Sequence, residues 1–207
     1  MLNILGKPAS INVRKVLWTC AELALPHQLE AWGTGSLSLQ SPQFLALNPG
    51  GLVPVIDDDG FILSESNSIC RYLADRHGGG RLLPPPSRER ALVERWMDWQ
   101  ATELNNSWRY AFMALVRHSP LHQDASLLDE GIAAWQHNMG LLERHLAGAG
   151  PYMTGATFTL ADVVIGLSVN RWKATPLPHA ALPAVDAYFA RLSQRPAFRE
   201  HGNNGLA

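Results

Sequence analysis

The sequence predicts a chain of two parts, an α/β part followed by an all-helical part. Short apolar runs with strand-like composition occur only before residue 65. A Gly- and Pro-rich stretch, His77 to Pro86, then interrupts the apolar periodicity. From Ser87 onward, apolar residues recur at helical spacing. We therefore expect a first domain at residues 1–77, a linker at 78–86 and a helical domain at 87–207.

The first part is expected to alternate strands and helices. Its predicted elements are a strand at 2–5, a helix from Ser10 to about residue 24, a strand at 27–32 parallel to the first, a short helix at 41–47, a hairpin over 53–63, and a helix starting at 64–67. This β-α-β-α-β-β-α order is that of a thioredoxin-like domain. Residues 9–12, Ala-Ser-Ile-Asn, occupy the place of the thioredoxin Cys-x-x-Cys, so dithiol redox chemistry is excluded there.

The second part is expected to be helical throughout. Its helices are predicted at 87–118, 124–147, from Thr159 to about 172, and 183–194. The buried stripe of the first is expected at Met97, Ala101, Leu104, Trp108, Phe112 and Leu115. Thr159 and Asp162 form a capping box, and Phe158 and Val163 a hydrophobic staple. We interpret this motif as a folding element.

The stretch from Asn48 to Asp75 carries the signals of a binding site. Pro54 stands inside a strand-like run, where it is either a cis bond or a strand-entry proline in trans. A cis bond would present the amide and carbonyl of Val53 to a ligand. The helix start at Glu65-Ser66 suits a carboxylate, and Glu65 suits an ammonium group.

Val53-Pro54 followed by Glu65-Ser66 resembles the glutathione site of the glutathione S-transferase family, in its bacterial, serine-type cytosolic form. The resemblance covers residues 2 to about 198. It implies that Val53 pairs its backbone with the cysteinyl part of glutathione, next to Pro54. It also implies that Ser66 and Glu65 hold the γ-glutamyl carboxylate and ammonium groups. Gln40 is a weaker match for the residue that reaches the glycine end.

The resemblance implies that Ser10, at the start of the first helix, stabilises the glutathione thiolate. A free cysteine thiol has a pKa of about 8.5. A charge-assisted hydrogen bond of roughly 1.5–3 kcal/mol and the helix dipole could lower it by about one to three units. Asn12 is the competing donor, and Ser10 could instead serve only as a helix cap.

A second substrate is expected between the two domains. Trp108, Arg109 and Phe112 are its candidate contacts on the long helix, with Trp32 opposite. Aromatic residues at helical spacing also fit a plain core. Arg109 could polarise or attract an acidic electrophile, or belong to a solvated polar stripe. Gln100 and Thr102 are candidates to touch a neighbouring subunit's glutathione.

The sequence thus predicts a cytoplasmic, homodimeric glutathione transferase in detoxification, with glutathione as co-substrate and no metal. Alternatives on the same site are peroxide or disulfide reduction, dehalogenation and isomerisation, or a non-catalytic binding or regulatory protein. A net charge of −1 gives no reason to expect nucleic acid or an anionic membrane as partner. No apolar run reaches the roughly 20 residues of a membrane span. Cys20 and Cys70 are expected to be small buried hydrophobes.

Overall fold

A four-stranded mixed sheet forms the first part of the computed structural model, which describes residues 1–206. The strand order is β2-β1-β3-β4. Strand β1 (Leu2–Leu5) pairs in parallel with β2 (His27–Glu30) and antiparallel with β3 (Val55–Asp58). Strand β3 continues antiparallel into β4 (Phe61–Ser64). The predicted thioredoxin-like order and the parallel first pair are confirmed.

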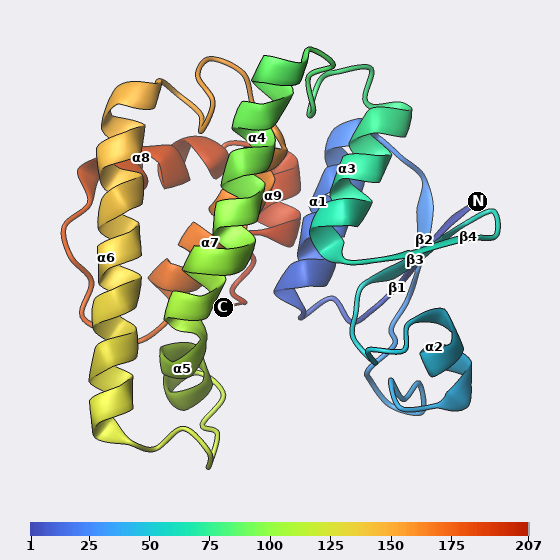
Figure 1. Cartoon of the computed structure of the whole chain (residues 1–207), viewed down its shortest axis with the longest axis horizontal. Helices are drawn as coiled ribbons and strands as arrows, with labels where there is room; N and C mark the ends of the chain where they lie inside the picture. The colour runs from blue at the N-terminus through green and yellow to red at the C-terminus, as the bar shows by residue number, and fades with distance from the viewer. Residues whose placement is uncertain (207) are drawn as a thin grey trace.

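Helices cover both faces of this sheet. Helices α1 (Ile11–Leu23) and α3 (Ser66–His77) pack against each other and lie between the sheet and the helical part (Figure 1). Because side chains alternate along a strand, Ile4 joins the main core on this face and Leu5 joins a smaller core on the other. That second core includes Phe44 from the short helix α2 (Pro42–Leu47).

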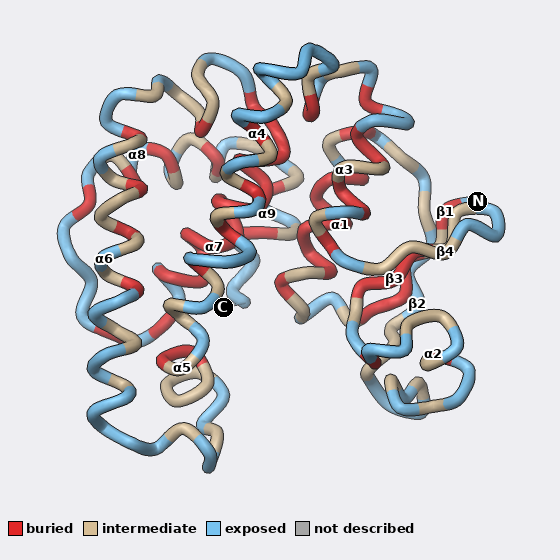
Figure 2. Tube along the Cα trace, viewed as in Figure 1, coloured by how far each residue is buried: buried red, intermediate tan, exposed pale blue. Residues whose placement is uncertain are grey.

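The second part is all-helical, as predicted. Its elements are α4 (Ser87–Trp99), a π-helical segment η1 (Gln100–Leu104), α5 (Asn105–Leu115), α6 (Ala125–Ala149), α7 (Leu160–Ala174), α8 (Pro183–Leu192) and α9 (Pro196–His201). Helix α7 is buried along almost its whole length and forms the centre of the helical part (Figure 2). Helix α9, which the sequence pattern did not reveal, packs on α1.

The predicted long helix over 87–118 is interrupted by the π-helical segment. The wider turn accommodates one extra residue and so shifts the inward-facing positions. Ala101, expected in the buried stripe, is exposed, whereas Gln100 is fully buried. The expectation that Gln100 touches a neighbouring subunit is wrong, because its side chain faces the interior.

The capping box at the start of α7 is confirmed. The amide of Thr159 donates to Asp162 Oδ2 at 2.8 Å. Asp162 Oδ1 also accepts from the amide of Met153 at 2.8 Å and from the hydroxyl of Tyr188 at 3.0 Å. Burial raises the pKa of the Asp162 carboxyl to about 6, against the opposing effect of these hydrogen bonds.

The segment between the two parts is docked on the protein. Leu82 and Leu83 are buried, and the amide of Leu160 donates to the carbonyl of Leu82 at 2.9 Å. Cys20 and Cys70 are buried free thiols, as expected. Within residues 1–206, none of the helices is long and apolar enough to cross a membrane.

Candidate active site

The start of α1 offers side-chain donors that the fold itself does not use. Ser10 is the N-cap, with extended backbone angles, but its hydroxyl makes no capping hydrogen bond. The Asn12 side chain also has no hydrogen-bond partner among the described residues, and both residues are only partly buried. The dipole of this 13-residue helix points its positive end at the same place. Two donors and a favourable field for an anion are therefore brought together.

The loop before β3 and the start of α3 form a small cavity beside these donors. The Val53–Pro54 bond is cis. Since β3 begins at Val55, the backbone groups of Val53 lie outside the strand ladder. Ser66 is the first, buried residue of α3, and Glu65 precedes it. The cavity measures about 50 Å³ and is lined by Asn12, Asn48, Leu52, Val53, Pro54, Glu65 and Ser66.

The backbone of Glu65 is strained. Its φ of 71° and ψ of 110° lie outside the regions that residues with a Cβ normally adopt. Such conformations cost roughly 1–3 kcal/mol and concentrate at ligand sites, where the surrounding structure holds them. The strain places the exposed Glu65 carboxylate directly before the first N–H groups of α3.

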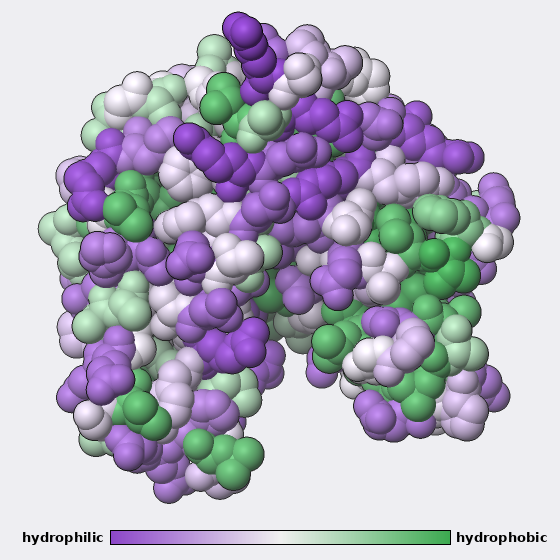
Figure 3. Space-filling model, viewed as in Figure 1, coloured by the Kyte–Doolittle hydropathy of each residue, from purple (hydrophilic) through white to green (hydrophobic). Residues whose placement is uncertain are grey.

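A larger cavity of about 440 Å³ opens between the start of α1 and helix α5. Its lining residues are Lys7, Ser10, Ile11, Asn12, Trp108, Arg109, Phe112, Met113, Arg117, His122 and Arg171. It lies in the notch between the two lobes in the space-filling view (Figure 3). Asn12 lines both cavities, so the small one and the large one meet at the start of α1.

The structure gathers most of the residues that the sequence singled out. Ser10, Asn12, Trp108, Arg109 and Phe112 all line the larger cavity. The predicted glutathione contacts at the loop and at the start of α3 line the smaller one. The spacing of Trp108, Arg109 and Phe112 on one helix thus serves a cavity wall as well as packing.

Trp32 and Gln40 are placed elsewhere. Trp32 packs on Phe44, with ring centroids 5.2 Å apart, and its Nε1 donates to Glu30 Oε2 at 2.9 Å. It belongs to the smaller core on the sheet face opposite α1, which is why it does not face α5. Gln40 is exposed and lies against Gly51 in the loop that leads to Val53.

Six residues of the larger cavity were missed by the sequence reasoning, and Arg171 is the most deeply buried of them. Its guanidinium lies 4.4 Å from the Trp108 ring centroid and 4.1 Å from that of Phe112. Burial lowers the pKa of Arg171 to about 9, and the nearby Arg14 and Arg117 act in the same direction. An arginine inside the apolar helix α7 was the available signal. Lys7, Ile11, Met113, Arg117 and His122 carried no such signal.

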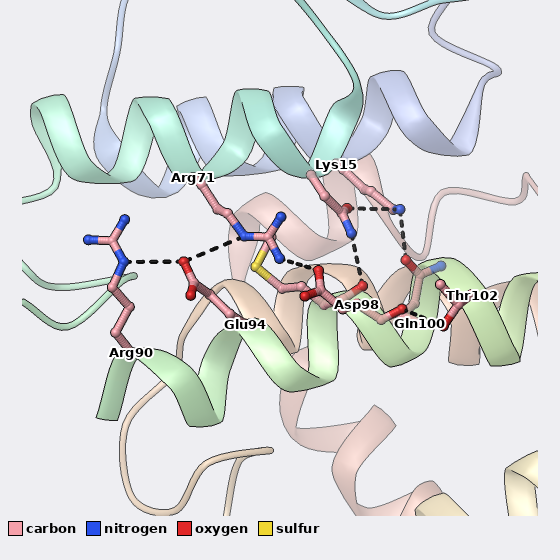
Figure 4. A network of polar contacts seen from close by, with 9 residues as sticks. Lys15, Arg71, Arg90, Glu94, Asp98, Gln100 and Thr102 are labelled. Carbon is pink, nitrogen blue, oxygen red and sulfur yellow. Dashed lines mark hydrogen bonds and ion pairs between the residues drawn. The ribbon is translucent and has the colours of Figure 1, made fainter. Parts of the chain in front are cut away.

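A buried polar network connects the two cavities beneath the surface. Lys15 Nζ donates to Gln100 Oε1 at 2.8 Å and to Asn67 Oδ1 at 3.2 Å. Gln100 Nε2 and Trp108 Nε1 both donate to Asn105 Oδ1, at 2.8 and 3.1 Å. Figure 4 shows Lys15 on α1 pointing at Gln100, where the π-helical segment turns that side chain inward. The start of α3 is therefore linked to the Trp108 ring.

A still larger hollow, of about 630 Å³, lies between α1 and helices α8 and α9. Its charged groups are already engaged. Arg195 Nε donates to Glu22 Oε1 at 2.9 Å, and Arg191 donates to the carbonyl of Pro151 at 2.8 Å. Because these groups satisfy one another, the hollow offers less to a ligand than the cavities at Ser10.

Comparison with known proteins decides the family. The family model described as "Glutathione S-transferase, N-terminal domain" matches residues 5–81. Glutathione S-transferase GstB of Escherichia coli (strain K12) is 35% identical over 202 residues, which cover 97% of each chain. The chain belongs to the glutathione S-transferase family. The resemblance recognised at Val53-Pro54 and Glu65-Ser66 is thereby confirmed.

Two further comparisons show what this member of the glutathione S-transferase family is similar to. The structure of the theta class glutathione S-transferase from Xanthomonas axonopodis pv. citri, with glutathione bound, matches with a TM-score of 0.92 and 32% identity. The match covers 100% of this chain and 99% of that one. Probable elongation factor 1-gamma 2 of Arabidopsis thaliana is 30% identical over 164 residues, which are 78% of this chain but 39% of that protein. The sequence of this chain is therefore also similar to part of a longer protein with a different name.

Among residues 1–206 of this transferase-family chain, no group of three or more His, Cys, Asp and Glu residues is placed to hold a metal ion. The residues around the two joined cavities supply hydrogen-bond donors, helix termini and cations.

Proposed function

We propose that this chain is a glutathione transferase that lowers the pKa of the bound glutathione thiol and directs the thiolate at a small electrophile. The observation that carries the proposal is the start of α1. There a hydroxyl and an amide without partners in the described chain face the point where the two cavities meet. An anion such as a thiolate is what those donors and the helix dipole favour.

In this proposal, glutathione binds along the smaller cavity. The backbone of Val53 pairs with the cysteinyl part of the tripeptide, beside the cis Pro54. Ser66 and the first N–H groups of α3 bind the γ-glutamyl carboxylate, and Glu65 binds its ammonium group. Gln40, near Gly51, is proposed to reach the glycine end. This orientation directs the thiol toward Asn12 and Ser10.

The reaction is a displacement or addition by sulfur. The thiol loses its proton to solvent, and Ser10 or Asn12 donates a hydrogen bond to the resulting thiolate. The sulfur then forms a bond to the electrophilic carbon, and the leaving group departs with its electron pair. A donor to the anion worth roughly 1.5–3 kcal/mol lowers the thiol pKa by about one to two units. No step calls for a metal ion.

The chain divides this work between its two parts. We propose that residues 1–77 bind glutathione, 78–86 form the linker, and 87–207 contribute the wall of the second-substrate cavity. We propose Trp108, Arg109 and Phe112 as that wall, and we leave Trp32 out because it packs against the smaller core. A cytoplasmic homodimer acting in detoxification is the assembly and role that we propose from the family.

The test is the ultraviolet absorbance of the bound glutathione thiolate as a function of pH, for the wild type, Ser10→Ala and Asn12→Ala. We expect a pKa about one to two units below that of free glutathione, restored by one of the two substitutions. Ser126→Ala, an exposed serine on α6, is the matched control and should change nothing.

Each outcome separates the alternatives. If Asn12→Ala alone returns the thiol pKa to that of free glutathione, the catalytic role belongs to Asn12 and the proposed binding site is unchanged. If the wild type binds glutathione without lowering its pKa, the transferase mechanism is wrong. If it binds no glutathione, the non-catalytic alternative replaces the enzyme. That second function is favoured by one observation, the similarity to part of an elongation factor 1-gamma protein.

A further inference from the structure

The larger cavity is strongly positive, although the chain as a whole is not. The sequence holds 17 Lys and Arg against 18 Asp and Glu. Four of these basic residues line the cavity, together with one histidine, and none of its described lining residues is Asp or Glu. The basic set is Lys7, Arg109, Arg117, Arg171 and His122. The positive charge is therefore concentrated at this cavity and does not reflect the net charge of the whole chain.

These cations come from four separate segments. Lys7 lies in the loop before α1, Arg109 on α5, Arg117 just after α5, and Arg171 on α7. Their approach is a product of the tertiary fold, and like charges at short range repel one another. The lowered pKa of Arg171, which Arg117 helps to depress, reflects that repulsion in addition to burial.

Several arginines elsewhere on the protein do have acidic partners. Arg71 pairs with Asp98 and Glu94, Arg90 with Asp75 and Glu94, and Arg195 with Glu22. Figure 4 shows the first two of these arginines on the interdomain face, directed at carboxylates. In contrast, Lys7, Arg109 and Arg117 form no ion pair with a carboxylate in the described part of the chain.

The aromatic residues of the cavity form an apolar part of its wall between these cations. The Trp108 and Phe112 rings meet edge to face at 5.4 Å, and both have a guanidinium over them. Arg117 lies 5.4 Å from the Phe112 centroid, while its exposed position keeps it at the mouth. Arg109 is exposed on the same wall. An apolar group with one anionic end matches this arrangement.

We propose that the second substrate is an electrophile carrying a carboxylate. The carboxylate binds at Arg109 and Arg117, the apolar body packs on Trp108 and Phe112, and the reactive carbon faces Ser10 and Asn12. The inference rests on the proposed function, because it assigns a substrate class to the same site. Carboxylates are the groups that arginine binds best, through paired N–H donors.

A suitable probe is 4-chloro-3-nitrobenzoate, with 4-chloro-3-nitrobenzamide as its uncharged match. The glutathione thiolate forms a sulfur–carbon bond at the ring carbon that bears chlorine. The carbon–chlorine bond breaks, chloride leaves with the electron pair, and the thiol proton has already passed to water. Each kcat/KM is divided by the rate constant of the same substrate with free glutathione at the same pH, which removes the difference in intrinsic reactivity.

We expect the normalised kcat/KM of the wild type to favour the carboxylate by about tenfold, the size expected of one charge-assisted contact. Arg109→Gln and Arg117→Gln should each lower the normalised kcat/KM several-fold for the carboxylate and clearly less for the amide. Salt at 0.5 M should weaken the preference, because exposed charges are screened. Arg88→Gln, an exposed arginine on α4 outside the cavity, should change neither substrate.

The inference is overturned if the amide is turned over as well as the benzoate, or if the arginine variants lower both substrates equally. Neither result touches the proposed function. Calorimetric titration with unreactive 3-nitrobenzoate and 3-nitrobenzamide provides a test that needs no turnover. If neither chlorinated substrate reacts and glutathione does not bind, the proposed function fails. In that case, the carboxylate site would still be established if the wild type binds 3-nitrobenzoate selectively and the Arg109→Gln/Arg117→Gln double variant does not. If the wild type does not bind 3-nitrobenzoate selectively, the carboxylate site is refuted.

Discussion

Two helix starts in this molecule are built from the same kind of residue and used differently. Thr159 begins α7 with a complete capping box, in which Asp162 accepts hydrogen bonds from Thr159, Met153 and Tyr188 inside the core. Ser10 begins α1 at a partly exposed position, and its hydroxyl caps nothing. The first start is closed by its own chain, and the second is open to the two cavities.

This difference indicates which helix termini are candidate ligand-binding sites. A terminus whose orphan N–H groups are satisfied internally contributes to stability, since a buried unpaired donor is costly. A terminus whose cap side chain has no partner contributes less to stability and leaves its field and donors for a ligand. The start of α7 should thus matter for folding, and the start of α1 for glutathione.

The largest expected effect is on the closed helix start. Asp162→Ala removes the carboxylate that accepts from three buried donors, so we expect the free energy of unfolding to fall by about 3–5 kcal/mol. Urea denaturation followed by tryptophan fluorescence measures it. Asp124→Ala removes an exposed cap on α6 and should cost only about 1 kcal/mol. Equal losses in the two variants would contradict the comparison.

The second prediction concerns Lys15, which anchors α1 further along the helix. Burial lowers the pKa of native Lys15 to about 8, against an ordinary value of 10.5. Between these values the unfolded chain binds more protons, so stability should rise with pH. The stability of the wild type relative to Lys15→Met should therefore increase by roughly 2 kcal/mol between pH 8 and 10.

Denaturation at several pH values measures the difference in the free energy of unfolding between the wild type and Lys15→Met. Lys173→Met, which removes an exposed lysine paired with Asp186, should show no such increase over the same range. A flat profile for Lys15→Met would mean that the native lysine stays charged in its network with Gln100 and Asn67.

The third prediction separates stability from binding at the start of α3. Glu65→Gly relieves the positive φ and should raise the free energy of unfolding by about 1 kcal/mol. It should also weaken glutathione binding by about tenfold, because the carboxylate is lost. Asp59→Gly, at a positive φ in the hairpin turn, should leave binding unchanged. Undiminished affinity in Glu65→Gly, measured by calorimetry, would remove Glu65 from the site.

The smallest expected effect is the sharpest test of the open helix start. Because the Ser10 hydroxyl makes no capping bond, Ser10→Ala should change the free energy of unfolding by less than about 0.5 kcal/mol. Ser41→Ala on α2 is the matched control, since the Ser41 hydroxyl accepts from the amide of Phe44 at 3.3 Å. It should lose about 1 kcal/mol. A larger loss in Ser10→Ala than in Ser41→Ala would make Ser10 a cap after all.

The residues of the site were predictable where local pattern and family motif coincide. Pro54 lies inside a strand-like run, and Glu65-Ser66 begins a helix 11 residues later in the chain. Trp32 shows the limit of this reasoning. A strand end predicts where the chain goes but not which sheet face the next aromatic joins, and Trp32 joined the face that carries Phe44.

The sequence by itself determined the order of strands and helices in the first part, the capping box at Thr159 and the family, because each depends on residues within about one turn or one hairpin. The tertiary structure alone decided that Gln100 turns inward to meet Lys15 and that Arg109, Arg117 and Arg171 share one cavity wall. Those contacts join residues far apart in the chain. Their positions depend on how α1, α5 and α7 pack, which no local spacing encodes.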